Sequence, residues 1–150
     1  MSAVPAVQRA LRGVCADLWP SADASLGAPN AASALDLAVV GKGKSEISNP
    51  TAGGAKRSLE ETVSVTVVLS SYRATDTEEA QDEANQAAWD SYTLLCEYFR
   101  TNPNNTLGGV CRDAMVTEGE SDDYRYEDDA GHVTGRATDI TVTVTAQVRL

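Results

Sequence analysis

The sequence predicts an α+β domain in which two helices pack on one face of a small antiparallel sheet. Three patterns support this fold class: an alternating apolar and polar run at residues 140–150, a second such run at 61–73, and two segments whose apolar residues recur every three or four positions. Alternation is typical of a half-buried strand, and a spacing of three and four of an amphipathic helix. The 150 residues fit one domain, 1–150, with an extended hairpin and a long basic loop.

The first predicted helix runs from Val4 to Leu18. Its apolar stripe consists of Val4, Val7, Leu11, Val14 and Leu18. Ser2 is the expected N-cap, and Pro5 is tolerated in the first turn. Trp19-Pro20 ends the helix, and the composition of residues 20–34, rich in Ala, Ser, Pro and Asn, indicates a connecting loop.

Two strands are predicted next, at residues 35–40 and at about 61–73, where Val63, Val65, Val67 and Leu69 share one face. The segment between them, about 41–58, contains four glycines and Pro50 and shows no usable periodicity. The sequence therefore predicts a hairpin with an oversized, flexible, basic loop. A connection of this length inside a compact domain is usually functional or disordered.

The second predicted helix begins near Thr75 and ends near Thr101. Either Thr75 with Glu78 or Asp76 with Glu79 can form a capping box at its start. One stripe of the helix carries Ala80, Ala84, Ala88, Tyr92, Leu95 and Phe99. The small alanines at its beginning favour close approach to a sheet or a neighbouring helix.

The remainder of the chain is predicted to be β structure. Residues 110–117 resemble a strand, and residues 122–127 and 132–137 resemble the arms of a hairpin around 128–131. Residues 140–150 alternate without interruption and predict a terminal strand with one buried face and one wet face.

The net charge of −10 argues against a protein that reads DNA sequence, because such proteins normally present a basic surface. Seven acids fall between Glu118 and Asp129, whereas all three lysines lie between Gly41 and Arg57. This segregation by sign suits docking to other proteins or to further copies of the chain. No secretory signal pattern or membrane-spanning run is apparent, so we expect a protein of the cytosol.

No motif predicts catalysis or a cofactor. Gly41-Lys42-Gly43-Lys44-Ser45 lacks the first glycine of a phosphate-binding loop, and the residues after it are a poor helix start. The acidic cluster lacks the spacing of a calcium loop. His132 is the only histidine, and Cys15, Cys96 and Cys111 have no metal-ligand spacing, so we expect free, buried thiols and no enzyme activity.

Five features follow one another in an order that carries a family resemblance: the run Glu61-Thr-Val-Ser-Val-Thr-Val-Val-Leu69, the capped helix of 80–99, Leu107-Gly108-Gly109, the acidic hairpin of 122–137, and the terminal strand of 140–150. Together they resemble the tail terminator, or tail completion, proteins of long-tailed bacteriophages of the siphovirus type. The resemblance covers about residues 35–150.

The resemblance implies a homo-oligomeric ring, usually a hexamer, that caps the tail tube and joins it to the head-tail connector or stopper protein. DNA would pass through the lumen of the ring. The implied partners are other copies of the chain, the major tail tube protein and the connector, with no cofactor. The implied location is the tail-head junction of the virion, and the host cytoplasm during assembly. The alternatives are another head-to-tail connector, such as a stopper or adaptor, or a small α+β ligand-binding protein.

Three groups of residues are candidates for these contacts. The basic loop would touch the tail tube or a neighbouring subunit through Lys42, Lys44, Lys56 and Arg57. The acidic hairpin would face the lumen, so that DNA slides and does not stick, through Asp122, Asp123, Glu127, Asp128 and Asp129. The wet face and the edge of the terminal strand would be assembly surfaces, through Thr141, Thr143 and Thr145.

Overall fold

The fold is an α+β domain, as a computed structural model describes it for residues 2–20, 22–28, 36–48, 59–102 and 105–149. Over these residues the elements are α1 (Val4–Leu18), β1 (Asp23–Leu26), β2 (Asp36–Ser48), β3 (Glu60–Arg73), α2 (Glu78–Thr101), β4 (Asp113–Glu127) and β5 (Val133–Arg149). The predicted fold class is confirmed, and the bounds of the first helix are those that the apolar stripe predicted.

The strands form one five-stranded sheet in the order β1-β2-β3-β5-β4. The four long strands are antiparallel to their neighbours, as predicted. The short β1 adds a parallel pairing with β2, so the sheet is mixed. β1 lies inside residues 20–34, which we had predicted to be loop, because four residues are too few for alternation to be visible.

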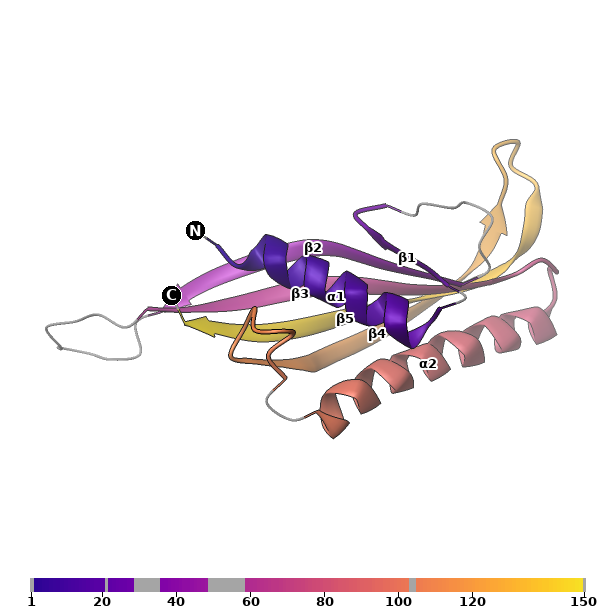
Figure 1. The fold of residues 1–150 in the computed structure, drawn as a ribbon. Helices are drawn as coiled ribbons and strands as arrows, with labels where there is room; N and C mark the ends of the chain where they lie inside the picture. Colours follow the sequence, from indigo (N-terminus) through magenta and orange to yellow (C-terminus); the bar gives the residue numbers. More distant parts are fainter. Residues whose placement is uncertain (1, 21, 29–35, 49–58, 103–104, 150) are drawn as a thin grey trace, which may run out of the picture.

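Both helices lie on the same side of the sheet (Figure 1), α1 over β1, β2 and β3, and α2 over β3, β4 and β5. The core joins alternate sheet positions to the helix stripes, and its fully buried residues include Leu11, Leu95, Val65, Val67, Ile140, Val142 and Val144. Cross-strand neighbours such as Val65 and Val144 point to the same side and pack together. The predicted alternation of β3 and β5 is therefore confirmed, and neither helix covers the opposite face.

A buried glutamate anchors the start of α1 to the sheet. Glu61 of β3 has no exposed surface, and its carboxylate accepts hydrogen bonds from the Ala3 backbone N–H at 2.8 Å and from the Ser2 hydroxyl at 2.6 Å. The Ser45 hydroxyl of β2 donates to the same carboxylate. The prediction that Ser2 is the N-cap is wrong. Ala3 occupies the N-cap position, and its side chain makes no capping hydrogen bond.

The start of α2 also differs from prediction. Thr77 is the N-cap, and its hydroxyl accepts a hydrogen bond from the Ala80 N–H at 3.1 Å. Neither Thr75 nor Asp76 fills this position. Asp76 instead pairs with Arg136 at 2.6 Å and with Arg125 at 3.4 Å, so it joins the connection before α2 to the hairpin of β4 and β5.

The predicted basic loop is wrong for residues 41–48, which continue β2. Gly43 lies directly under α1, where an added Cβ would be 2.3 Å from Cγ1 of Val4. Glycine is therefore required there for close packing, although it had suggested a loop. The strand conformation also excludes a phosphate-binding turn at Gly41 to Ser45. The rest of the predicted loop, 49–58, lies outside the described residues.

The C-terminal half is a single long hairpin. The predicted strand at 110–117 begins later, at Asp113, and it is continuous with the predicted arm at 122–127 as one strand, β4. The second hairpin arm continues into the terminal strand as β5. β5 lies between β3 and β4, so the prediction that it offers a free edge is wrong. Between α2 and β4, Leu107, Gly108 and Gly109 all have positive φ, of 49°, 74° and 93°, and form the turn that starts the return of the chain.

Candidate assembly site

The helix-free face of the sheet is lined by small hydroxyl side chains at its centre. Thr141 is exposed, and Thr143 and Thr145 are half-buried. Two hydrogen bonds link this face laterally: the Thr62 hydroxyl donates to Gln147 Oε1 at 3.0 Å, and the hydroxyls of Thr117 and Thr145 lie 3.2 Å apart. The centre of this face is therefore polar, and some of its hydroxyl groups already bond to one another or to neighbouring strands within the sheet.

The predicted acidic group divides between the two faces. Asp122 is the register partner of Asp139 on the helix-free side. Asp123 is the next residue and points to the helix side, where it accepts hydrogen bonds from Asn85 at 3.2 Å and from the Thr138 hydroxyl. Asp123 therefore holds α2 against the hairpin, and only part of the predicted cluster can face a single lumen.

The other three predicted acids lie at the hairpin tip, where Glu127 ends β4 and Asp128 and Asp129 belong to the turn. The Asp128 carboxylate accepts hydrogen bonds from the backbone N–H of Ala130 at 3.0 Å and of His132 at 2.8 Å. This is the Asx type of turn stabilisation, in which an aspartate satisfies the backbone of its own loop. Asp128 therefore stabilises the turn, and all three of these acids are exposed.

The lysines predicted for a loop are on β2. Lys44 is exposed and pairs with Glu46 at 3.0 Å along the strand. Lys42 lies in a β-bulge between Val40 and Gly43, and with Arg9 it lines a groove of about 560 Å³ between α1 and β2. The structure thus brings Arg9 to the same place, which the sequence did not indicate. The remaining two candidates, Lys56 and Arg57, lie outside the described residues.

A tyrosine cluster at the hairpin end of the helix-free face was missed. The rings of Tyr72 and Tyr126 meet edge to face, with centroids 5.2 Å apart. The Tyr124 hydroxyl donates to Asp139 at 3.2 Å. Burial and, next, the charge of Asp139 raise the pKa of Tyr124 to about 12. The signal available in the sequence was the spacing of Tyr124 and Tyr126, which places both rings on one face of a strand.

The two outer edges of the sheet are the other features that sequence reasoning missed. β1 pairs only with residues 37–40 of β2, and among the described residues no strand pairs with the outer edge of 41–48. The same is true of the outer edge of β4 along Asp113–Glu127. Each edge therefore presents backbone N–H and C=O groups without a strand partner, which is the usual template for pairing with another chain.

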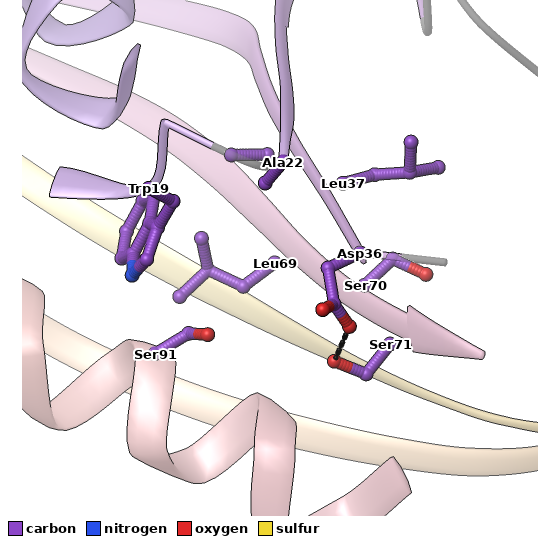
Figure 2. A pocket seen from close by; sticks show the side chains of 9 residues that line it. Trp19, Ala22, Asp36, Leu37, Leu69, Ser70, Ser71 and Ser91 are labelled. Atoms are coloured by element: carbon purple, nitrogen blue, oxygen red, sulfur yellow. Dashed lines mark hydrogen bonds between the residues drawn. The ribbon is translucent and has the colours of Figure 1, made fainter. Parts of the chain in front are cut away.

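A small, largely enclosed cavity, shown in Figure 2, lies between Trp19, Leu69 and Ser91 and has a volume of about 60 Å³. The indole Nε1 of Trp19 is buried and has no hydrogen-bond partner among the described residues. Since a water molecule in the liquid takes about 30 Å³, this space suits about two waters. It is far below the several hundred Å³ of a typical site for an organic ligand.

Two further searches of the described residues bear on the site. They contain no group of three or more His, Cys, Asp or Glu side chains arranged to hold a metal ion. They also contain no helix with the length and apolar character that a membrane crossing requires.

The class of protein that these observations define is an α+β domain with a half-covered, mainly antiparallel sheet. No protein-family model matches the chain, and no match was found among curated proteins.

Proposed function

We propose that this chain is a structural subunit of a long-tailed bacteriophage, a tail terminator that forms a ring at the end of the tail tube. In this proposal the ring joins the tube to the head-tail connector, and DNA passes through its lumen. The observation that carries the proposal is the one-sided sheet: helices cover one face, and the other face is broad, polar and uncovered by them.

The helix-free face is suited to line the lumen. Thr141 and Thr143 lie at its centre, and Glu118 and Glu120 are their register partners on β4. The carboxylates repel phosphates, the hydroxyls carry no positive charge, and a net charge of −10 in every subunit adds to the repulsion. DNA would therefore slide past this face without being retained.

The alternatives differ in how well the structure supports them. A stopper or adaptor would use the same kind of ring one position nearer the head, so its location in the particle separates it from a terminator. A small-ligand protein would need an enclosed pocket of several hundred Å³; the cavity beside Trp19 is about 60 Å³, and the groove of about 560 Å³ between α1 and β2 is open to solvent. The phage-structural function is therefore the better supported proposal.

The test uses the purified chain and tail tubes assembled from the tube protein of the same phage. We expect rings in negative-stain micrographs, and tubes that acquire a cap at one end and stop growing when the chain is added. Binding to isolated connectors without any effect on tubes would indicate a stopper or adaptor. Tubes that grow unchanged, with no binding to connectors, would exclude the proposal.

A further inference from the structure

The groove of about 560 Å³ between α1 and β2 holds positive charge that its own surroundings do not neutralise. Arg9 of α1 and Lys42 of β2 line it, and both are exposed. Beside them the Gln8 amide donates to the Gly41 backbone oxygen at 2.6 Å and holds the helix against the strand. No acid is among the lining residues, and neither cation has a carboxylate partner among the described residues.

This lack of pairing sets the groove apart from most of the chain. Elsewhere among the described residues the basic side chains pair with carboxylates, as in Lys44, Arg73, Arg100, Arg112, Arg125 and Arg136. Arg12, one turn further along α1, and Arg149, at the end of β5, are the other exceptions. In a chain with a net charge of −10, the groove is therefore a local centre of positive potential that attracts carboxylates.

The groove also has apolar lining. Leu26, at the end of β1, is 45% exposed, which is unusual for a large apolar side chain in this chain. Pro5 of α1 is exposed as well, and Val40 of β2 lies between them in the lining. A segment that fills the groove should therefore carry both acidic and apolar side chains.

The tip of the long hairpin, residues 127–133, has this combination. Glu127 and Asp129 are exposed there, and their carboxylates have no partner among the described residues. Val133, which is 38% exposed, is the register partner of Glu127. Partners across a pair of strands project to the same face, so an apolar and an acidic side chain lie together on the tip. Asp128 remains engaged with the backbone of its turn.

The tip cannot reach the groove of its own copy. It projects beyond the rest of the sheet (Figure 1), because the pairing of β3 with β5 ends at Arg73 and Arg136. Arg73 lies six residues (73 minus 67) beyond Val67, and Val67 is the partner of Val40 in the groove. At about 3.3 Å per residue, the tip is therefore more than about 20 Å from this groove. Only the groove of another copy can receive it.

We infer that the hairpin tip of one copy docks in the groove between α1 and β2 of the next copy. Glu127 and Asp129 would meet Arg9 and Lys42, and Val133 would cover Leu26. The contact is heterologous, because tip and groove are different surfaces of one chain, and a rotation that closes it gives a ring. The inference rests on the proposed function for its ring, and it adds which surfaces join neighbouring subunits.

Three charge-inverted variants provide the test. The groove variant carries Arg9→Glu and Lys42→Glu, and the tip variant carries Glu127→Lys and Asp129→Lys. The swap variant carries all four changes and keeps the wild-type net charge of −10, because the two pairs of changes cancel. All four positions are exposed, and circular dichroism checks that each variant folds. Sedimentation velocity measures the association of each protein and of mixtures.

We expect the wild type to associate, and the groove and tip variants each to associate at least about tenfold more weakly. The swap variant should associate like the wild type, and so should an equimolar mixture of groove and tip variants. In both cases every tip meets a groove of opposite charge. Glu79→Lys with Asp82→Lys, exposed on α2, matches the tip variant in net charge and should leave association unchanged.

Several outcomes would overturn the inference. They are a wild type that is monomeric at its highest soluble concentration, groove and tip variants that associate as the wild type does, or a swap variant that stays dissociated. A monomeric wild type whose binding to tail tubes is lost only in the groove variant would show that an acidic segment of the tube protein occupies the groove. That result would also overturn docking between copies.

The inference and the proposed function can fail separately. Association that depends on these charges, in a protein that does not cap tubes, refutes the terminator function alone. Capping by rings that form normally in the groove and tip variants refutes the docking of the tip alone.

Discussion

The carboxylate of Glu61 accepts a hydrogen bond from the backbone N–H of Ala3 at 2.8 Å, although 58 positions separate the two residues. A helix N-terminus leaves four backbone N–H groups without intrahelical partners, and it carries a partial positive charge. β3 therefore supplies the anionic cap that the sequence around α1 does not. This contact also explains how a fully buried glutamate is accommodated, since Ser2 and Ser45 donate to the same carboxylate.

We predict that Glu61→Gln lowers the free energy of unfolding by about 1–3 kcal/mol. In the wild type the Glu61 carboxylate accepts hydrogen bonds from three donors. Glutamine replaces this charged acceptor by an amide, whose NH2 group would face those donors. Urea denaturation of the variant and the wild type measures the change. Glu46→Gln, on the exposed part of β2, is the control and should shift stability by less than about 1 kcal/mol. Equal stability of Glu61→Gln and wild type would contradict this prediction.

The same residue predicts a dependence of stability on pH. Burial alone raises the pKa of Glu61, but hydrogen bonds from Ala3, Ser2 and Ser45 outweigh it, so the pKa lies below its ordinary value of 4.5. The folded state therefore holds this proton less tightly than the unfolded state. The stabilisation is complete above the unfolded pKa and is lost as the pH falls through the folded pKa.

We therefore expect the difference in urea midpoint between wild type and Glu61→Gln to be constant near neutral pH and to shrink below about pH 4.5. Comparing the two proteins cancels the titration of the exposed carboxylates. A difference that stays the same into strong acid would show that the charge of Glu61 does not stabilise the fold.

Two glycines should respond to alanine in opposite directions. An added Cβ at Gly135 would lie 2.1 Å from the Arg73 backbone oxygen and 2.6 Å from Cε2 of Tyr72, so we expect Gly135→Ala to destabilise by at least about 1–3 kcal/mol. At Gly13, exposed within α1, no atom lies within 4 Å of the added Cβ. Gly13→Ala should stabilise by about 0.5–1 kcal/mol. Thermal unfolding measures the change in stability of each variant relative to the wild type. Changes of the same sign in both variants would refute the prediction.

Asp76 should control the local stability of the long hairpin. It pairs with Arg136, whose hydrogen bond lowers the pKa of the aspartate, and with Arg125 on the neighbouring strand. We expect Asp76→Asn to increase amide hydrogen exchange in residues 122–137 without changing exchange in α1. Mass spectrometry resolves the two regions. Glu78→Gln, one residue beyond the Thr77 cap, is the control. If Glu78→Gln increases exchange in residues 122–137 as much as Asp76→Asn does, the effect is not specific to Asp76.

The three cysteines should react with a disulfide reagent at different rates. Burial raises the pKa of Cys15 to about 12 and also raises the pKa of Cys111, so both thiols are poorly ionised as well as covered. Cys96 is half-buried on α2 and should react first in the native protein. Each cysteine that reacts releases a coloured thiolate from the reagent, so absorbance against time gives the rates. Cys96→Ser should remove the fast phase. A fast phase that survives this substitution would contradict the prediction.

The elements that sequence predicts well are those whose burial follows a regular period. In β3 and β5 every second residue is buried over long stretches, because the sheet has one covered face. α1 is delimited by Trp19 and by a single stripe that ends in Cys15 and Leu18. In each case the residue pattern and the environment have the same period, so local sequence is sufficient.

The elements that sequence predicts poorly depend on contacts between distant segments. Gly41 and Gly43 suggested a loop, but both belong to a strand, and α1 approaches Gly43 too closely for a side chain. The interior position of β5 follows from its pairing with both β3 and β4, which no local pattern encodes. For the same reason the sequence could not show which strand edges lack a strand partner among the described residues, since only strand order shows this.

The position of β5 also orders the events of synthesis. It pairs with β3 along Glu60–Arg73 and with β4 along Asp113–Glu127, so neither of these strands has its inner partner until residues 133–149 have left the ribosome. Pairings that span so many residues close slowly, because the entropy of loop closure must be overcome first. A nascent chain therefore has two separate parts of the sheet, β1-β2-β3 and β4, and the sheet is complete only after its last strand is inserted between them.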